Sequence, residues 1–333
     1  MCLQVRKTIH KIFLFSFIIL IALSLSCHKD NPIDGGKPPC GGIDPGIVPN
    51  PPYNSPIWHP SGQFIGFNHT PLRNIVYPYP CYPEQVFAGD STGFWLINSD
   101  GTNKRRIFPY TLQTPAWSPD GKWIAFVSGA QILKMRFTGT IFDTTTLTQL
   151  TSAGGNFFPT WSPDGQWIAY DRSITDGSGP AGVWIMRIDG TERKAVFGGA
   201  FPAWHPSGNI LIGVVGTSFT SVWTRFVQYD LLQLKAIDTL SAVVGNDNRQ
   251  PHYSPDGTKI AFWSSGNLWL MDTTGNNQHQ LTTRGADVEF NWSPSGNRIV
   301  YARYQSTDWT MNNGVLWMID VYSKTETQFT FNP

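Results

Sequence analysis

Short stretches of alternating hydrophobic and polar residues run along most of the chain, and a tight-turn signal interrupts them at a regular spacing. In "PAWSPDGKWIAF" (115–126), Ser-Pro-Asp-Gly separates a short extended segment from a mainly apolar run. Ser, Pro, Asp and Gly suit the four positions of a type I turn in that order. The residues on both sides favour extended structure, because they are β-formers or precede a proline. The stretch therefore predicts a tight β-hairpin.

This hairpin signal occurs six times, with turn prolines at 60, 119, 163, 206, 255 and 294 and intervals of 59, 44, 43, 49 and 39 residues. A third strand and turn follow, as in "VWIMRIDGTE" (183–192), and then a short fourth strand, as in "QLT" (280–282). Four strands in about 40–45 residues is the period of a propeller blade. We therefore expect an all-β fold, a six-bladed β-propeller of four-stranded antiparallel blades, over residues 56–330.

The repeated pattern W-S-P-D-G-x-x-I-A-F, then L-W-x-M-D-x-x-G, then x-L-T, resembles the TolB-type (WD40-like) propeller repeat over about 56–330. Two features depart from a uniform repeat. The first interval, 59 residues, predicts an insertion in the first blade. Gly213 stands where the equivalent strands carry an aromatic residue, which predicts less aromatic packing in the fourth blade.

The N-terminal segment has the pattern of an export signal. Basic residues at 6, 7 and 11 precede an uncharged run at 12–26, which is short for a bilayer span but typical of a signal peptide. Residues 1–27 resemble a bacterial lipoprotein signal, in which Cys27 would carry the lipid; ordinary secretion with cleavage nearby is the alternative. Residues 28–55 contain 7 Pro and 5 Gly and predict a flexible tether. We expect a bacterial cell-envelope protein, lipid-anchored at the periplasmic or surface face of the outer membrane.

The chain has four cysteines. Cys2 would leave with the signal peptide and Cys27 would take the lipid, so Cys40 and Cys81 remain. Exported proteins meet an oxidising environment. A disulfide between Cys40 and Cys81 would fix the tether to the first blade, and two independent thiols are the alternative.

Composition argues against several classes of function. The net charge is +1, with 24 Lys and Arg against 23 Asp and Glu and no basic stripe, so nucleic acid is not an expected partner. The sequence lacks the G-x-S-x-G nucleophile motif and local His or Cys spacings for zinc. We therefore predict no catalytic residue, metal or cofactor. His59 and His205 occupy a turn position that Ser fills in other copies and are interpreted as turn residues.

The strand order predicts which face binds a ligand. In each blade, the turn between the first and second strands and the turn between the third and fourth strands lie on the same face of the ring. The longer connections, such as 68–93, 171–182 and 302–314, share the other. Function tends to lie on long loops over a rigid scaffold. The candidate ligand-binding residues at this face are Phe157, Phe201, Arg249, His252, Asp287, Glu289, Tyr82 and Trp309.

Within this set, Phe157 and Phe201 are expected to form an apolar wall. Arg249, Asp287 and Glu289 are expected to form a mixed-charge sector; the alternative is that Arg249 forms a structural ion pair with one of the two acids. The pattern favours a binding module for a protein, peptide or glycan. A lyase or hydrolase acting on a polysaccharide or peptide is the alternative, and it would need convergent titratable groups at the mouth of the ring. A purely structural envelope component is a third possibility.

Overall fold

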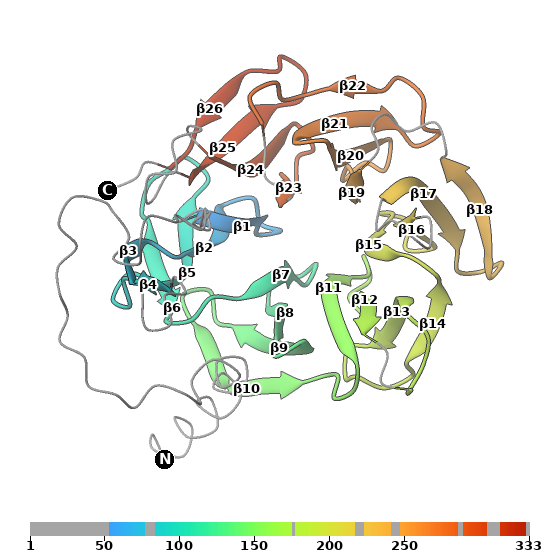
Figure 1. Cartoon of the computed structure of the whole chain (residues 1–333), viewed down its shortest axis with the longest axis horizontal. Coiled ribbons are helices and arrows are strands. Elements are labelled where there is room, and N and C mark those ends of the chain that lie inside the picture. Colours follow the sequence, from blue (N-terminus) through green and yellow to red (C-terminus); the bar gives the residue numbers. More distant parts are fainter. Residues whose placement is uncertain are drawn as a thin grey trace, which may run out of the picture.

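The computed structural model describes residues 53–76, 84–174, 177–216, 223–240, 247–285, 289–304 and 314–330. Their regular structure consists of β-strands, and none of these residues lies in a helix that could cross a membrane. Six four-stranded antiparallel sheets surround a central axis as the blades of a propeller (Figure 1). The predicted fold class and blade number are confirmed.

Each blade is built from four strands in chain order, interrupted only in blade 1 by an inserted hairpin, and the first strand lies nearest the axis. Blade 1 comprises β1 (Tyr53–Trp58), β2 (Phe64–His69), β5 (Gly93–Asn98) and β6 (Arg105–Phe108); blade 2, β7 (Gln113–Trp117), β8 (Trp123–Ser128), β9 (Gln131–Phe137) and β10 (Phe142–Gln149); blade 3, β11 (Gly155–Trp161), β12 (Trp167–Ile174), β13 (Gly182–Arg187) and β14 (Lys194–Phe197). Blade 4 comprises β15 (Ala200–Trp204), β16 (Ile210–Gly216), β17 (Trp223–Asp230) and β18 (Lys235–Leu240); blade 5, β19 (Asn248–Tyr253), β20 (Lys259–Ser264), β21 (Asn267–Asp272) and β22 (His279–Gln280); blade 6, β23 (Phe290–Trp292), β24 (Arg298–Tyr304), β25 (Gly314–Asp320) and β26 (Glu326–Gln328).

The long first interval corresponds to an extra hairpin in blade 1. Strands β3 (Leu72–Val76) and β4 (Glu84–Phe87) form a separate two-stranded sheet between β2 and β5. The insertion therefore lies in a connection of the loop-rich face, as the strand order predicts.

The hydrophobic core lies between the blades. Six clusters of buried side chains occur, and each combines residues of two neighbouring blades. The aromatic residue that ends each innermost strand belongs to these interfaces and is at most 9% exposed. Its members are Trp58, Trp117, Trp161, Trp204, Tyr253 and Trp292. A single blade has two apolar faces, so only a closed ring buries all of them.

Blade 4 differs from the expectation of weak aromatic packing. A side chain on Gly213 would have its Cβ 2.8 Å from Cζ of Phe197, which belongs to the outermost strand of blade 3. The Phe197 ring also stacks on Tyr229, with 5.6 Å between ring centroids. The space left by the missing aromatic side chain is thus filled from the neighbouring blade.

Blade 1 closes the ring against blade 6 without exchanging a strand. Among the residues that the structure describes, each of the two blades contains only its own strands, and a shared apolar cluster lies between them. Glu289 Oε2 accepts hydrogen bonds from the Ser55 backbone N–H (2.6 Å) and hydroxyl (2.9 Å). Asn291 Oδ1 accepts one from the Trp58 backbone N–H (2.9 Å). Residues just before the predicted domain boundary at 56 therefore take part in closure.

The start of β1 is fixed in the same way. Tyr53 is fully buried, and its ring lies 4.4 Å from the ring of His69 and 5.6 Å from that of Phe67. Its hydroxyl accepts a hydrogen bond from Lys104 (3.1 Å). Strand β1 therefore includes Tyr53, three residues before the boundary that the repeat pattern predicts, and this tyrosine adds to the core.

The repeated turns are linked from one blade to the next. In blade 1, His59 Nδ1 accepts the Ser61 backbone N–H (3.2 Å), and Nε2 donates to the Gly121 carbonyl in the next turn (3.0 Å). His205 makes the same contacts between blades 4 and 5, reaching the Gly257 carbonyl at 3.2 Å. Both histidines are turn residues, as expected, and each also connects two neighbouring turns.

The x-L-T motif follows the outermost strand in blades 2 and 5, and Gln-Phe-Thr (328–330) takes its place in blade 6. In blade 5, the Thr282 hydroxyl accepts the backbone N–H of Leu268 (3.0 Å), and the Gln280 side chain donates to the Thr282 carbonyl (2.6 Å). The equivalent bonds form at Thr151 and at Thr330. The motif therefore satisfies backbone groups where the last strand leaves the sheet.

Candidate functional site: the central channel

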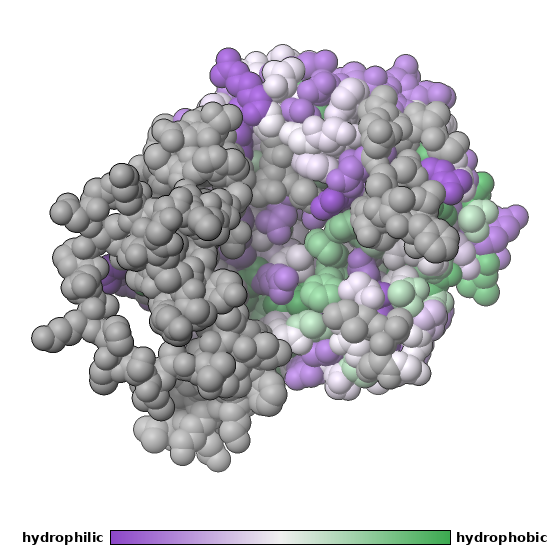
Figure 2. All heavy atoms as spheres, in the orientation of Figure 1, coloured by the Kyte–Doolittle hydropathy of each residue, from purple (hydrophilic) through white to green (hydrophobic). Residues whose placement is uncertain are grey.

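A cavity of about 440 Å³ follows the axis of the ring. Its walls come from the six innermost strands, β1, β7, β11, β15, β19 and β23. The lining extends from residues at the start of these strands to turn prolines such as Pro60 and Pro163. The cavity therefore follows the inner strands from the loop-rich face to the turn face. Figure 2 shows the hollow at the centre of the ring, reached by both hydrophilic and hydrophobic surface.

Six equivalent residues at the start of these strands form the mouth of the channel, at the loop-rich face. They are Ser55, Thr114, Phe158, Phe201, Gln250 and Glu289. The first five each precede a proline and adopt a positive φ between 43° and 53°. The pairing register of the same five strands shifts at this point.

The repeated positive φ and register shift have a structural consequence. A positive φ is uncommon for residues other than glycine, and a bulge redirects a side chain out of the regular strand alternation. Because the feature recurs in five blades, the repeat itself builds it. It places the side chain before each proline at the channel.

One side of the mouth is aromatic. The rings of Phe158 and Phe201, from blades 3 and 4, meet edge to face with 4.6 Å between centroids. Such a pair prefers this geometry because the positive edge of one ring meets the negative face of the other. We call these two residues the aromatic wall.

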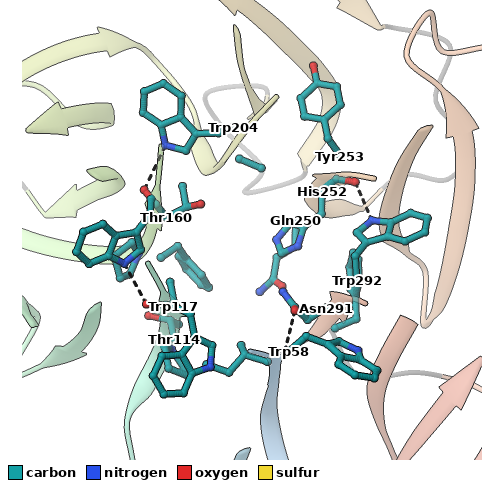
Figure 3. Close-up of a pocket in the computed structure, with 18 of the residues that line it drawn as sticks. Trp58, Thr114, Trp117, Thr160, Trp204, Gln250, His252, Tyr253, Asn291 and Trp292 are labelled. Atoms are coloured by element: carbon teal, nitrogen blue, oxygen red, sulfur yellow. Dashed lines mark hydrogen bonds between the residues drawn. The ribbon is translucent and has the colours of Figure 1, made fainter. Parts of the chain in front are cut away.

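The other side is polar and comes from blades 5 and 6. Gln250, His252, Asn291 and Glu289 line the cavity there, and Figure 3 shows Gln250, His252 and Asn291 around it. We call these four residues the polar wall. Thr114 lies between the two walls, and its hydroxyl is buried without a hydrogen-bond partner among the described residues.

Few side chains of the polar wall are charged. Burial lowers the pKa of His252 to about 4, so this imidazole is neutral at physiological pH. Its backbone carbonyl accepts the indole N–H of Trp292 (3.2 Å), which ties it to blade 6. Glu289 already binds Ser55 across the closing interface. The wall therefore offers mainly amide and imidazole groups for hydrogen bonding.

Some of the expected site residues line the channel and others do not. Phe201, His252 and Glu289 line the channel. Phe157 does not: it pairs with Asp171 across β11 and β12 and packs into the cluster between blades 2 and 3. The bulge after Phe157 turns the next residue, Phe158, toward the channel instead.

Arg249 lies outside the channel lining. Its guanidinium forms two bonds to the Asp247 carboxylate, at 2.9 and 2.8 Å, and lies 5.6 Å from the Trp263 ring. The ion pair of Arg249 that the described residues show is therefore with Asp247, two residues earlier in the chain. Tyr82, Asp287 and Trp309, together with Cys27, Cys40 and Cys81, lie outside the described residues.

The site residues that sequence reasoning missed are Thr114, Phe158 and Asn291. The signal that could have found Thr114 and Phe158 is the position directly before the proline of each inner strand. In the part of the chain that the structure describes, no three His, Cys, Asp or Glu side chains gather as a metal-binding group.

Comparison with known proteins gives a consistent fold. No protein-family profile matches the chain. An uncharacterised protein of Agrobacterium fabrum, Atu1656, is 26% identical over 219 residues, which are 62% of this chain and 71% of that protein.

Solved structures align over most of the ring. TolB from Acinetobacter baumannii has a TM-score of 0.61 and 21% identity, over 80% of this chain but only 63% of that protein. A structure from Agrobacterium tumefaciens described as a TolB has a TM-score of 0.55 and 20% identity, over 68% and 84%. An oligogalacturonate lyase in complex with manganese has a TM-score of 0.51 and 11% identity, over 80% and 89%. At these identities the likeness concerns architecture, and the chain has the TolB-type six-bladed β-propeller fold.

Proposed function

We propose that this protein is a binding module that takes an extended segment of polypeptide into the mouth of its central channel. The observation that carries the proposal is the division of the mouth into an aromatic wall and a polar wall of amide, imidazole and carboxylate groups. An extended peptide presents backbone N–H and C=O groups together with side chains. Gln250 and Asn291 can pair with the backbone groups, while the aromatic wall contacts an apolar side chain.

The size of the channel supports this ligand class. Its volume of about 440 Å³ lies within the usual range of ligand sites, roughly 300–1,000 Å³. An inner strand of five or six residues is about 17–20 Å long at roughly 3.3 Å per residue. A few residues of extended chain match that length. The TolB-type fold of the ring fits a protein partner, and a glycan is the second ligand class that the sequence left open.

The enzymatic alternative has less support from the same residues. A lyase or hydrolase needs an acid and a base that converge on the substrate. Among the described lining residues, the titratable candidates are His252 and Glu289, besides Tyr253. The first is neutral at physiological pH and packs 5.1 Å from Phe290, and Glu289 is bound to Ser55. Their contacts favour positioning and hydrogen bonding.

Phage-displayed random decapeptides provide a probe for this proposal. A peptide selected on the folded protein is expected to lose at least about tenfold in affinity when Phe158 and Phe201 are both replaced by Ala. The reason is that a buried apolar contact of one side chain contributes about 1.5–3 kcal/mol, and tenfold corresponds to about 1.4 kcal/mol. Isothermal titration calorimetry measures both affinities.

Tyr322→Ala is the matched control, because this aromatic residue is 80% exposed in the turn after β25, on the turn face. It should leave peptide affinity unchanged. The proposal fails if the double variant binds the selected peptide as tightly as the original protein. It also fails if no peptide is selected and a glycan array binds instead.

We further propose that the protein is exported and anchored to the bacterial envelope through a lipid on Cys27, and that Cys40 and Cys81 are bonded. The basic start, the uncharged run at 12–26 and the Pro- and Gly-rich stretch support this arrangement. Cys27→Ala is expected to move the protein from the membrane fraction to the soluble fraction without changing its melting temperature. Retention in the membrane would indicate an uncleaved anchor.

A further inference from the structure

We propose that Asp171 is a positioning residue for the aromatic wall, and that gain or loss of its proton changes the position of Phe201 at the channel mouth. Asp171 lies in β12 of blade 3, outside the channel lining, and is only 6% exposed. Its carboxylate accepts the backbone N–H of Phe201, which begins the next blade. One buried group thus connects the body of blade 3 to the mouth.

The bond falls at the strained point of the inner strand. Phe201 has a φ of 53° and lies where the register of β15 and β16 shifts between Ala200 and Ala203. Its N–H is therefore available to a partner in the preceding blade. Glu289 plays the same part for Ser55, the equivalent residue of blade 1, at 2.6 Å. A carboxylate of the previous blade thus holds the mouth residue at two of the six positions.

Blade 1 shows how a neutral group fills the position of Asp171. Asn68 is the equivalent residue of β2, and it makes two bonds of 2.8 Å to the backbone of Leu112, accepting from N–H and donating to C=O. Leu112 lies two residues before Thr114, the equivalent of Phe201, so the amide binds the same approach to the next blade at an earlier point. An amide or a protonated carboxyl can do both. An ionised carboxylate can only accept, so ionisation of Asp171 changes the hydrogen bonding that the site can support.

The surroundings of Asp171 give a charge little compensation. The charged neighbour in sequence is Arg172, whose guanidinium lies 5.1 Å from the Trp184 ring and donates to the Ser178 hydroxyl. Strands β11 and β15, which pack against β12, contain no charged residue, and β13 contributes only Arg187 at the far end of its pairing with β12. No ion pair joins Asp171 to any other described residue.

Burial therefore raises the pKa of Asp171 to about 7, against the bond from Phe201, which lowers it. A carboxyl with such a pKa changes charge within the physiological range. The ionised form requires more donors or water than the single N–H provides. The segment that carries Phe201 has to shift to supply them, so its contact with Phe158 changes with pH.

Fluorine NMR tests this directly. p-Fluorophenylalanine is incorporated at position 201 of the full chain, and the ¹⁹F shift is followed from pH 5 to pH 9. We expect a single titration with a midpoint near pH 7, and its loss in Asp171→Asn. The same label at Phe64, on the turn side of blade 1, should show no titration with this midpoint.

Two results would overturn the inference: a shift that is flat across this pH range, or a titration that persists in Asp171→Asn. If that variant does not fold, Asp171→Ser, which keeps an acceptor, takes its place. The NMR readout needs no ligand. The consequence that peptide affinity also varies with pH rests on the proposed function, so a titrating Phe201 with unchanged affinity would count against that function alone.

Discussion

Gly121→Ala is expected to destabilise the ring by about 3–6 kcal/mol. The residue has a φ of 68°, a conformation that costs an alanine about 1–2 kcal/mol. In addition, the new Cβ would lie 2.4 Å from Cε1 and Nε2 of His59. The imidazole would have to move, which adds about 1–3 kcal/mol for overpacking and about 1 kcal/mol for its lost bond to the Gly121 carbonyl.

Gly165 provides a matched control in blade 3. It occupies the same turn position with a φ of 69°, but the nearest atom to an added Cβ is Cδ of Pro119 at 3.8 Å. Gly165→Ala should therefore cost only the backbone term, about 1–2 kcal/mol. Urea unfolding curves measure both variants. Equal losses in the two would show that the link between turns at His59 adds nothing to stability.

Asp171→Asn is expected to gain up to about 4 kcal/mol of stability relative to the original protein as the pH rises from 4 to 8. The pKa of Asp171 is raised from 3.8 to about 7 by burial. A carboxyl with a raised pKa stabilises the folded state most fully below pH 3.8, and this contribution is lost as the pH rises through 7. The amide carries no charge at any pH and lacks this loss.

The difference between the two proteins isolates this one group, because histidines such as His69 and His252 titrate in both. Those histidines have lowered pKa values and act in the opposite direction, so stability of the original protein alone would mislead. Chemical unfolding at pH 4, 6 and 8 gives the difference. A pH-independent difference would mean that Asp171 titrates with an ordinary pKa in the folded protein.

The architecture was predictable because it rests on local signals that repeat. Ser-Pro-Asp-Gly, or a variant of it in three of the copies, specifies its turn from adjacent residues, and six hairpins in phase leave a ring as the way to bury both faces of each sheet. The insertion in blade 1 followed from the length of one interval. The role of Phe197 did not, because it fills a space beside Gly213 that belongs to a different blade.

The candidate site was harder to predict for a related reason. The repeated hairpin pattern does not show whether Phe157 or Phe158 reaches the axis. The bulge shifts the alternation of side chains between the two faces of the strand by one residue. The partners of Ser55, Phe201 and Arg249 are also set by geometry after folding. The strand order predicted which face carries the long loops, but it did not identify the residues that line the channel.

Photo-crosslinking locates the ligand on the ring. p-Benzoylphenylalanine is placed at position 158, in the aromatic wall, or at position 322, which is exposed on the turn face. The label is then irradiated with a bound, selected decapeptide. We expect a peptide adduct from position 158 and none from position 322. An adduct from position 322 with none from position 158 would place binding on the opposite face and contradict the assignment of the channel mouth.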